Sequence, residues 1–263
     1  MKKMMTLGPK GTYSEIASNT FIKNLNLDVS LEFKHSIDAC FSTVFDYLVV
    51  PIENSSDGFI QRTLDLLALS NAYITHDLTL PISFKLISNI PLDEVTSIYV
   101  QFKAQNQCLD ILNTLGKKLI ITESNTESLD KHLLDFNSAA IIPSHLLASS
   151  NYVVNAVEDY KNNETRFILI ENNLNLETTS LLYKVSMCII PFDDKPGLLS
   201  DILFLFSKEK INLSSIMSRP TKEKIGSYTF FLDFLLEKDK LESLFCELEK
   251  LKERFHYKLL GIY

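Results

Sequence analysis

Short continuous runs of apolar residues recur through residues 1–171, separated by segments with helical periodicity. Residues 47–52 (Tyr-Leu-Val-Val-Pro-Ile) and 139–143 (Ala-Ala-Ile-Ile-Pro) are runs of the kind found in buried strands of parallel sheets. The helical pattern after the first run places Ile60 and Leu64 on one face. This alternation predicts an α/β unit. Its other predicted elements are strands at 4–7, 84–88, 97–101, 119–122 and 167–171, and helices at 12–25, from 102 to 115 and at 128–136.

Two loops of this unit have the composition of ligand-binding loops. Residues 8–11 (Gly-Pro-Lys-Gly) end the first strand, and Thr12-x-x-Glu15 then has the form of a capping box. Residues 53–58 (Glu-Asn-Ser-Ser-Asp-Gly) follow a buried strand, at the sheet edge where open α/β folds bind ligands. Taken alone, each motif also fits an ordinary solvated turn. Ser55 has no His or Asp at a recognisable triad spacing, which argues against nucleophilic catalysis.

The composition turns polar from residue 172 to 180, and we expect the domain boundary there. The elements beyond it follow a βαββαβ order, which is the ferredoxin-like order. We expect Pro196 as the first residue of the first helix, with Gly197 keeping the approach to it open. The predicted strands are 182–190, 212–219, 227–236 and 257–262, and the predicted helices are 196–208 and 239–255.

Composition and charge narrow the class of protein. The 263 residues are 46% hydrophobic, which is enough for two cores, and the net charge of −7 without a basic run argues against a nucleic-acid partner. No stretch approaches the roughly 20 apolar residues of a membrane helix. The basic start, Met-Lys-Lys-Met-Met, is followed by residues 8–10 (Gly-Pro-Lys) instead of an apolar run. We therefore expect a cytoplasmic protein with no membrane partner.

The four cysteines and five histidines are scattered along the chain, without the close pairs of a zinc site or the density of a disulfide framework. We expect reduced thiols and no metal.

Five segments in order resemble the signature motifs of the prephenate dehydratase family over nearly the full chain. Three lie in the α/β unit: residues 8–14 (Gly-Pro-Lys-Gly-Thr-Tyr-Ser), 50–58 (Val-Pro-Ile-Glu-Asn-Ser, then Gly58) and 159–167, which ends in Asn-x-Thr-Arg-Phe. Residues 195–199 (Lys-Pro-Gly-Leu-Leu) and 218–220 (Ser-Arg-Pro) resemble the effector-binding motifs of the family's ACT domain. Each motif is weak alone, but five in sequence order are specific.

The resemblance implies an α/β fold. A catalytic region at 1–175 would have two lobes like those of periplasmic binding proteins, with the substrate in the cleft between them. A ferredoxin-like ACT domain would occupy 181–263. The implied reaction converts prephenate to phenylpyruvate in L-phenylalanine biosynthesis, without a cofactor and under feedback control by L-phenylalanine. Because ACT pockets of this family form between protomers, the resemblance also implies a homodimer or homotetramer.

The resemblance also assigns roles to residues. Prephenate must lose its ring carboxylate as CO2 and its ring hydroxyl as water, so a group that hydrogen-bonds the departing oxygen assists the reaction. Thr165 is the candidate catalytic residue. The implied substrate-binding residues are Asn54, Ser55, Gln107, Arg166, Gly11 and Thr12. The implied effector-binding residues are Pro196, Gly197, Leu198, Leu199, Ser218, Arg219 and Pro220.

Arg166 has two interpretations. Its guanidinium offers a planar fork for a carboxylate of the dianionic substrate, or it forms an ion pair with Glu164 or Asp159. The alternation of side chains along a strand also predicts that Thr165 and Arg166 point to opposite faces unless the strand begins after them.

The sequence departs from the family pattern at three places. Val100 stands where the family has an active-site serine, and a valine cannot replace its hydrogen bond; Gln101 or Lys103 is a candidate substitute. Met217 stands where the effector motif has a glutamate. Residues 56–57 (Ser-Asp) replace an apolar residue and a glutamate, which is a milder change.

Three alternative functions stay open. An arogenate dehydratase performs the same elimination on a substrate with an amine in place of the keto group. A prephenate decarboxylase resembles the catalytic region but does not aromatise its product, and the intact residues 165–167 argue against it. Val100 motivates the third alternative, an amino-acid sensor in which catalysis has been lost.

Overall fold

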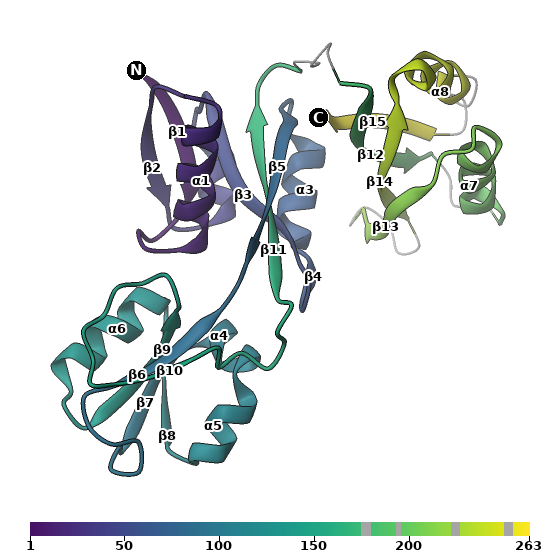
Figure 1. Ribbon diagram of the computed structural model, residues 1–263. Helices are drawn as coiled ribbons and strands as arrows, with labels where there is room; N and C mark the ends of the chain where they lie inside the picture. Colours follow the sequence, from purple (N-terminus) through teal and green to yellow (C-terminus); the bar gives the residue numbers. More distant parts are fainter. Residues whose placement is uncertain (175–179, 193–195, 222–226, 250–254) are drawn as a thin grey trace. The chain divides into compact units, whose positions relative to one another are not determined.

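The computed structural model describes residues 1–174, 180–192, 196–221, 227–249 and 255–263 (Figure 1). The chain forms two compact units, each assembled from separate stretches of sequence. The first unit contains residues 1–43, 49–60 and 78–167. The second unit contains residues 44–48, 61–77 and 168–263.

The first unit begins with a lobe built around a parallel pair of strands. β1 pairs with β2 from Lys2↔Val29 to Leu7↔Lys34, β3 lies on the other side of β1, and β4 pairs antiparallel with the end of β3. The elements of this lobe are β1 (Lys2–Leu7), α1 (Tyr13–Asn24), β2 (Val29–Lys34), α2 (Ile37–Ser42), β3 (Tyr47–Asn54), β4 (Gly58–Phe59) and the start of β11 (Glu164–Glu171). The residues of β3 from Tyr47 to Ile52 are all buried, as their apolar run predicts.

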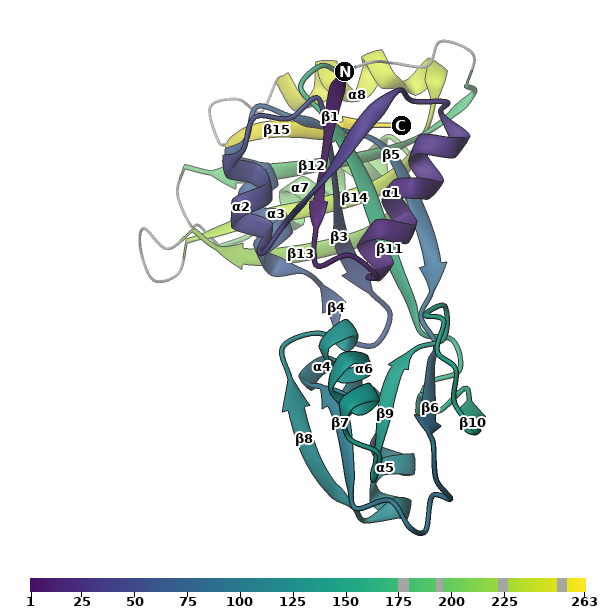
Figure 2. The same cartoon turned by 90° about the vertical axis from the view of Figure 1, so that its left-hand side faces the viewer.

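The second lobe of the first unit is a five-stranded sheet in the order β10-β6-β9-β7-β8. β7 runs parallel to β8 and β9, whereas β6 runs antiparallel to β9 and β10. The elements are β6 (Phe84–Ser88), β7 (Ser97–Gln101), α4 (Phe102–Gln107), α5 (Leu109–Leu115), β8 (Lys118–Thr122), α6 (Asn125–Leu134), β9 (Ser138–Pro143) and β10 (Tyr152–Asn155). Figure 2 shows this lobe from the side.

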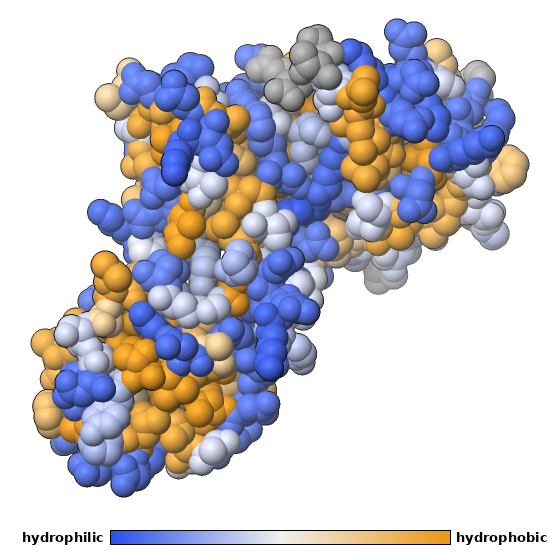
Figure 3. Space-filling view, in the orientation of Figure 1, coloured by the Kyte–Doolittle hydropathy of each residue, from blue (hydrophilic) through white to orange (hydrophobic). Residues whose placement is uncertain are grey.

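Alternation along the strands of this lobe supplies two apolar faces. Leu86 and Ile141 pack with Ala104 and Leu112, so α4 and α5 cover one face of the sheet. The neighbouring strand residues Ile87, Ala140 and Ile142 pack with Leu129 of α6 on the other face. Apolar side chains also reach the surface of this lobe, where Figure 3 shows them as orange areas between polar ones.

The second unit contains the predicted βαββαβ sequence of elements. Its sheet has the order β13-β14-β12-β15, and β5 lies beside β15, which it joins through the parallel pair Gly261↔Ile74. The elements are α3 (Gln61–Leu69), β5 (Tyr73–Pro81), β12 (Leu182–Pro191), α7 (Leu198–Lys208), β13 (Leu213–Pro220), β14 (Tyr228–Glu237), the 3-10 turn η1 (Lys238–Lys240), α8 (Leu241–Glu249) and β15 (Phe255–Ile262). Phe206, Phe234, Leu244 and Phe255 are central to its core.

Residues 61–77 are held in the second unit although the N-terminal motifs flank them in sequence. The ammonium of Lys258 on β15 donates hydrogen bonds to the carbonyl oxygens of Leu67 (2.9 Å), Ala68 (2.8 Å) and Ser70 at the end of α3. A cation at a helix carboxyl end is favourable because it meets the negative end of the helix dipole. Gly261 lies against β5, where an added Cβ would stand 2.7 Å from the Cβ of Ile74. These contacts fix α3 and the start of β5 onto the ferredoxin-like fold.

Most predicted strands and helices are found, with corrections at helix ends. The helix expected at 102–115 is interrupted at Cys108, which separates α4 from α5. Pro196 is not the first helical residue: α7 begins at Leu198, and Gly197 is its N-cap residue with φ +88°. The helix expected to reach 255 ends earlier, because β15 begins at Phe255. The expected domain boundary lies mostly on residues 175–179, outside the described residues.

The capping box predicted at Thr12 and Glu15 is wrong, because the hydrogen bond from Glu15 N to the Thr12 side chain is not formed. Thr12 precedes α1, but its side chain makes no capping hydrogen bond and its hydroxyl donates to Leu7 O at 3.4 Å. Glu15 accepts a hydrogen bond from Gly11 N at 2.5 Å instead of from Thr12 N. The acidic half of the motif therefore fixes the glycine loop before the helix.

No helix in the described part of the chain has the length and apolar content needed to cross a bilayer. Among the described residues, no three His, Cys, Asp or Glu side chains form a group able to hold a metal ion.

Candidate active site

A pocket of about 510 Å³ lies within the first unit and is lined by both of its lobes. This volume is within the range of roughly 300–1,000 Å³ that is usual for small-molecule sites. Its lining residues come from the loop after β1, the β3–β4 segment, the starts of β6 and β11, α4 and the start of α6. Four of the seven residues to which a catalytic or substrate-binding role was assigned line it: Thr12, Asn54, Gln107 and Thr165.

The orientation of the Asn54 amide is fixed by the backbone that follows it. Its Oδ1 accepts hydrogen bonds from Ser56 N (2.9 Å), Asp57 N (3.1 Å) and the Ser56 hydroxyl (2.6 Å). Because backbone N–H groups are obligatory donors, the side-chain atom facing them must be the oxygen. The Asn54 NH2 group therefore points the other way, where it donates to Thr165 Oγ1 at 2.8 Å and to Asn163 Oδ1 at 3.0 Å.

This orientation determines the neighbouring amides in turn. Since Asn163 Oδ1 accepts from Asn54, its Nδ2 is the atom that donates to Gln107 Oε1 at 2.9 Å. Gln107 Nε2 then stands 3.4 Å from the Ser56 hydroxyl. These hydrogen bonds close a polar ring of Asn54, Asn163, Gln107 and Ser56 beside the pocket. Asn54, Gln107 and Asn163 are buried. Asn163 belongs to the third motif, but no role was predicted for it.

The Thr165 hydroxyl is the group that this ring leaves available. Its oxygen accepts from Asn54, and within the described residues it donates no hydrogen bond. A threonine hydroxyl carries one hydrogen, which is therefore free for a ligand in the pocket. The donated Asn54 hydrogen also polarises the O–H bond and makes it a better donor.

The loop after β1 is held against the second lobe by close packing at Gly11. Its φ is +87°, and an added Cβ would stand 2.7 Å from Thr126 Cγ2 and 3.3 Å from Leu146 Cδ2. The Gly11 carbonyl lies 3.0 Å from His145 Nε2, which must be the donor of that bond. Gly11 itself is not part of the pocket lining, and the substrate-binding role implied for it stays a prediction.

Tyr13 joins the two lobes and lines the pocket, although sequence reasoning gave it no role. Its hydroxyl donates to Ser83 O at 2.7 Å and accepts from Ser83 N at 2.9 Å. Burial raises the pKa of Tyr13, opposed by the hydrogen bond to Ser83. The residue is therefore neutral and serves as a wall of the pocket.

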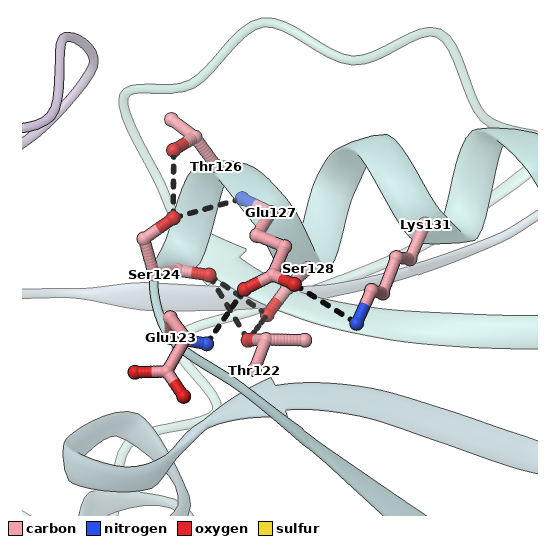
Figure 4. A network of polar contacts seen from close by, with 7 residues as sticks. All are labelled: Thr122, Glu123, Ser124, Thr126, Glu127, Ser128 and Lys131. Atoms are coloured by element: carbon pink, nitrogen blue, oxygen red, sulfur yellow. Dashed lines mark hydrogen bonds and ion pairs between the residues drawn. The ribbon is translucent and has the colours of Figure 1, made fainter.

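The start of α6 forms another wall of the pocket through Glu123, Ser124 and Asn125. Ser124 Oγ accepts from Glu127 N at 3.1 Å, and Glu127 Oε2 accepts from Glu123 N at 2.7 Å (Figure 4). Lys131 holds the other oxygen of Glu127 at 2.9 Å. This network fixes the helix start at the pocket.

The structure places Ser55 and Arg166 outside the pocket lining. The Ser55 hydroxyl accepts from Glu164 N at 2.8 Å and donates to Asn162 O at 3.1 Å, so it ties two chain segments together. Arg166 follows Thr165 within β11, so the two side chains take opposite faces of the strand. Its Nε stands 3.3 Å from Glu53 Oε2. Arg166 therefore forms an ion pair with Glu53, a partner that was not among the two expected.

Val100 itself does not line the pocket, whereas its neighbours Gln101 and Lys103 do. Val100 is fully buried in the core of the second lobe. The Gln101 side chain accepts from Lys103 N (2.8 Å) and Ala104 N (3.2 Å), so it caps α4. Cys108 after this helix is also buried, and burial followed by the charges of Asp159 and Glu158 raises its pKa to about 12.

Comparison with known proteins identifies the family. A family model described as prephenate dehydratase matches residues 4–175, and one described as ACT domain matches residues 193–253. A prephenate dehydratase of Methanocaldococcus jannaschii is 34% identical over 252 residues, which are 92% of this chain and 91% of that protein. The chain belongs to the prephenate dehydratase family. A Bacillus subtilis prephenate dehydratase is 29% identical across 98% of this chain and 100% of that protein.

Two solved prephenate dehydratase structures have the same fold. The Staphylococcus aureus enzyme superposes with a TM-score of 0.82 at 28% identity and covers 100% of both chains. The Arthrobacter aurescens enzyme, determined in complex with L-Phe, has a TM-score of 0.82 at 25% identity over 99% of this chain and 89% of that chain. The predicted fold class, an α/β dehydratase region with two lobes and a C-terminal ACT domain, is confirmed.

The residues that correspond to the effector motifs of this dehydratase family lie in the second unit. Pro196 and Gly197 precede α7, Leu198 is buried against the ACT core, and Leu199 is exposed. Ser218, Arg219 and Pro220 end β13. Arg219 is engaged with Gln61 (2.6 Å) and with both carboxylate oxygens of Asp65 (3.0 and 2.9 Å) on α3. Local sequence patterns did not predict this contact, because 154 residues separate Arg219 from Asp65 in the chain.

Proposed function

We propose that this chain catalyses the decarboxylating dehydration of prephenate to phenylpyruvate, as a carbon–oxygen lyase of L-phenylalanine biosynthesis that needs no cofactor. The observation that carries the proposal is the Thr165 hydroxyl, whose oxygen is held by Asn54 Nδ2 at 2.8 Å and whose hydrogen is free for a ligand in the pocket. The match to the dehydratase family model over residues 4–175 supports the same reaction.

The chemistry needs little more than this hydroxyl. As the ring carboxylate departs as CO2, its bonding electrons enter the ring, and the carbon–oxygen bond breaks with its electrons on the leaving oxygen. That oxygen leaves as hydroxide and becomes water by taking a proton from solvent. The Thr165 O–H donates a hydrogen bond to the oxygen while its charge develops, and threonine keeps its own proton. Gln107 also lines the pocket, and its Nε2 carries a second hydrogen besides the one that it donates to Ser56.

The proposal is tested with purified chain and prephenate, following phenylpyruvate. Thr165→Val preserves the shape of the side chain but removes the hydroxyl, and we expect kcat to fall by roughly 100-fold or more, with a much smaller change in KM. Thr165→Ser retains the hydroxyl and serves as the matched control. Absence of phenylpyruvate with the wild-type chain would refute the proposed reaction.

Arogenate is a second candidate substrate, because the acidic residues Asp57 and Glu123 line the pocket and carboxylates are suited to an ammonium group. Two Arabidopsis thaliana relatives are named arogenate dehydratase/prephenate dehydratase, at 29% and 26% identity over 86% of this chain. The ratio of kcat/KM for prephenate and arogenate decides between them. A non-aromatic product would instead indicate a decarboxylase, and binding without turnover a sensor.

We further propose that L-phenylalanine regulates the enzyme through the ACT domain, with the effector-binding residues named above. The relative determined in complex with L-Phe supports this proposal. The proposed domain division is 1–175 and 181–263, the proposed assembly is a homodimer or homotetramer, and the proposed location is the cytoplasm. Titration with phenylalanine during turnover, combined with molar mass from light scattering, tests effector and assembly together.

A further inference from the structure

Lys103 is the one cationic residue among the described residues that line the pocket. Arg166, the arginine nearest to Thr165 in sequence, lies outside the lining with its Nε close to Glu53. Lys103 is exposed, and within the described part of the chain its ammonium has no ion-pair partner. Asp57 and Glu123 also line the pocket, so a dianionic ligand has a single favourable charge to meet there.

The backbone of Lys103 is fixed on the same helix that presents Gln107. Gln101 caps α4 through its hydrogen bond to Lys103 N, at 2.8 Å. Lys103 and Gln107 are four residues apart on α4, so they share one face with Cβ atoms separated by roughly 5–6 Å. Gln107 belongs to the polar ring of Asn54 and Asn163 that positions the Thr165 hydroxyl. Lys103 therefore lies about one helical turn from Gln107, a member of the polar ring.

The two carboxylates of prephenate differ in what a cation does to them. Pairing with the ring carboxylate would stabilise a charge that must be lost as CO2, and so would raise the barrier. Pairing with the carboxylate of the 2-oxo side chain leaves the barrier unaffected, because that charge persists in the product. Ile82, Phe84 and Phe167 also line the pocket, and a ring carboxylate placed against these apolar residues would find no compensating charge, which would favour its loss as CO2.

We propose that Lys103 is a substrate-anchoring residue that binds the carboxylate of the 2-oxo-acid side chain. The inference rests on the proposed function, since it assigns a subsite for that substrate. The proposal gives prephenate a defined orientation in the pocket: its ring hydroxyl faces Thr165, and its side-chain carboxylate faces α4.

The test compares prephenate with the product phenylpyruvate, which keeps the side-chain carboxylate and has lost the ring carboxylate. For Lys103→Met we expect KM for prephenate and KI for phenylpyruvate to rise together by about tenfold or more, as for loss of a charge-assisted hydrogen bond, with kcat within about threefold. Lys103→Arg retains the charge and should stay within about threefold of wild type. Lys118→Met, at an exposed lysine outside the pocket lining, is the matched control.

A rise in KM with an unchanged KI for phenylpyruvate would place Lys103 at the ring carboxylate and overturn the proposal, as would no change in either constant. If the wild-type chain yields no phenylpyruvate, the proposed reaction fails by itself. Calorimetric binding of prephenate and of phenylpyruvate to wild type and Lys103→Met then decides the anchoring role: weaker binding of both to the variant supports it, and equal or absent binding overturns it.

Discussion

Arg219 donates hydrogen bonds to both carboxylate oxygens of Asp65, with Nε 3.0 Å from Oδ1 and Nη2 2.9 Å from Oδ2. The side chains retain only 14% and 16% exposure, so the pair is shielded from solvent. Arg219 belongs to the segment with the proposed effector role, whereas Asp65 lies on α3, which directly follows the pocket residues 57–60 in the chain. The bidentate pair thus connects the effector motif to α3, and residues 57–60 just before this helix line the pocket.

We expect Asp65→Asn to uncouple the response to phenylalanine. The substitution keeps the shape of the side chain but removes the charge that positions Arg219. The phenylalanine concentration for half-maximal effect should rise by about fivefold, while kcat without phenylalanine stays within about twofold. Because the chain contains no tryptophan, calorimetry is the suitable binding measurement. Glu242→Gln, at an exposed position of α8, is the control, and an unchanged phenylalanine response in Asp65→Asn would contradict the link.

Asn54→Asp should inactivate the enzyme without altering the size of the side chain. A carboxylate cannot donate to Thr165 Oγ1, so the threonine hydroxyl turns to donate to the new carboxylate and no longer faces the substrate. We expect kcat to fall about as far as in Thr165→Val. Combining the two substitutions should add little further loss, because both act through one hydroxyl. Fully multiplicative losses in this double-mutant cycle would show that Asn54 acts independently of Thr165.

Gly11→Ala should destabilise the fold by on the order of 2–4 kcal/mol, from strain at φ +87° together with overlap with Thr126 Cγ2 at 2.7 Å. Adding Thr126→Ser removes the clashing methyl group and should recover the steric part of the loss. Gly58→Ala is the matched control, since Gly58 has φ +75° but nothing within 4 Å of an added Cβ. Urea unfolding measures all three, and equal losses at Gly11 and Gly58 would rule out the steric contribution.

His132 should make the stability of the fold depend on pH below neutrality. Burial lowers the pKa of His132, opposed by the charge of Asp135. The Ser138 hydroxyl donates to Asp135 O at 2.6 Å, so it accepts a hydrogen bond from His132 Nδ1 at 3.0 Å. Nε2 is therefore the nitrogen that takes up a proton when the pH falls. Within the described residues, that buried nitrogen has no hydrogen-bond partner.

Because the folded pKa of His132 lies below the unfolded value of about 6.5, its stabilising contribution is complete above that pH and is lost as the pH falls. We expect the free energy of unfolding to decrease from pH 7 to pH 5 more steeply in wild type than in His132→Gln. Chemical denaturation at a series of pH values checks this. Parallel curves for the two proteins would exclude His132 as the responsible group.

The short-range features of this protein were readable in its sequence. Apolar runs gave β3 and β9, helical periodicity gave α1 and α6, and the βαββαβ order gave the ACT fold, because each depends on neighbours a few residues away. Where local signals competed, the sequence misled: Thr12 looked like a capping residue, but Glu15 holds Gly11 N instead. Pro196 looked like a helix start, but Gly197 at φ +88° precedes the helix.

Tertiary structure decided which of the motif residues meet and in what orientation. The bond from Asn54 to Thr165 spans 111 residues, and only the Ser56 and Asp57 backbone reveals which atom of the amide donates. Strand alternation placed Arg166 beside Glu53 and left Lys103 as the pocket's cation. Such facts depend on packing and hydrogen bonding between distant segments, which no local pattern of residues encodes. The sequence by itself determined the family and most elements, whereas the fold determined the orientation of the Asn54 amide, the position of Lys103 in the pocket lining and the attachment of α3 to the ACT domain.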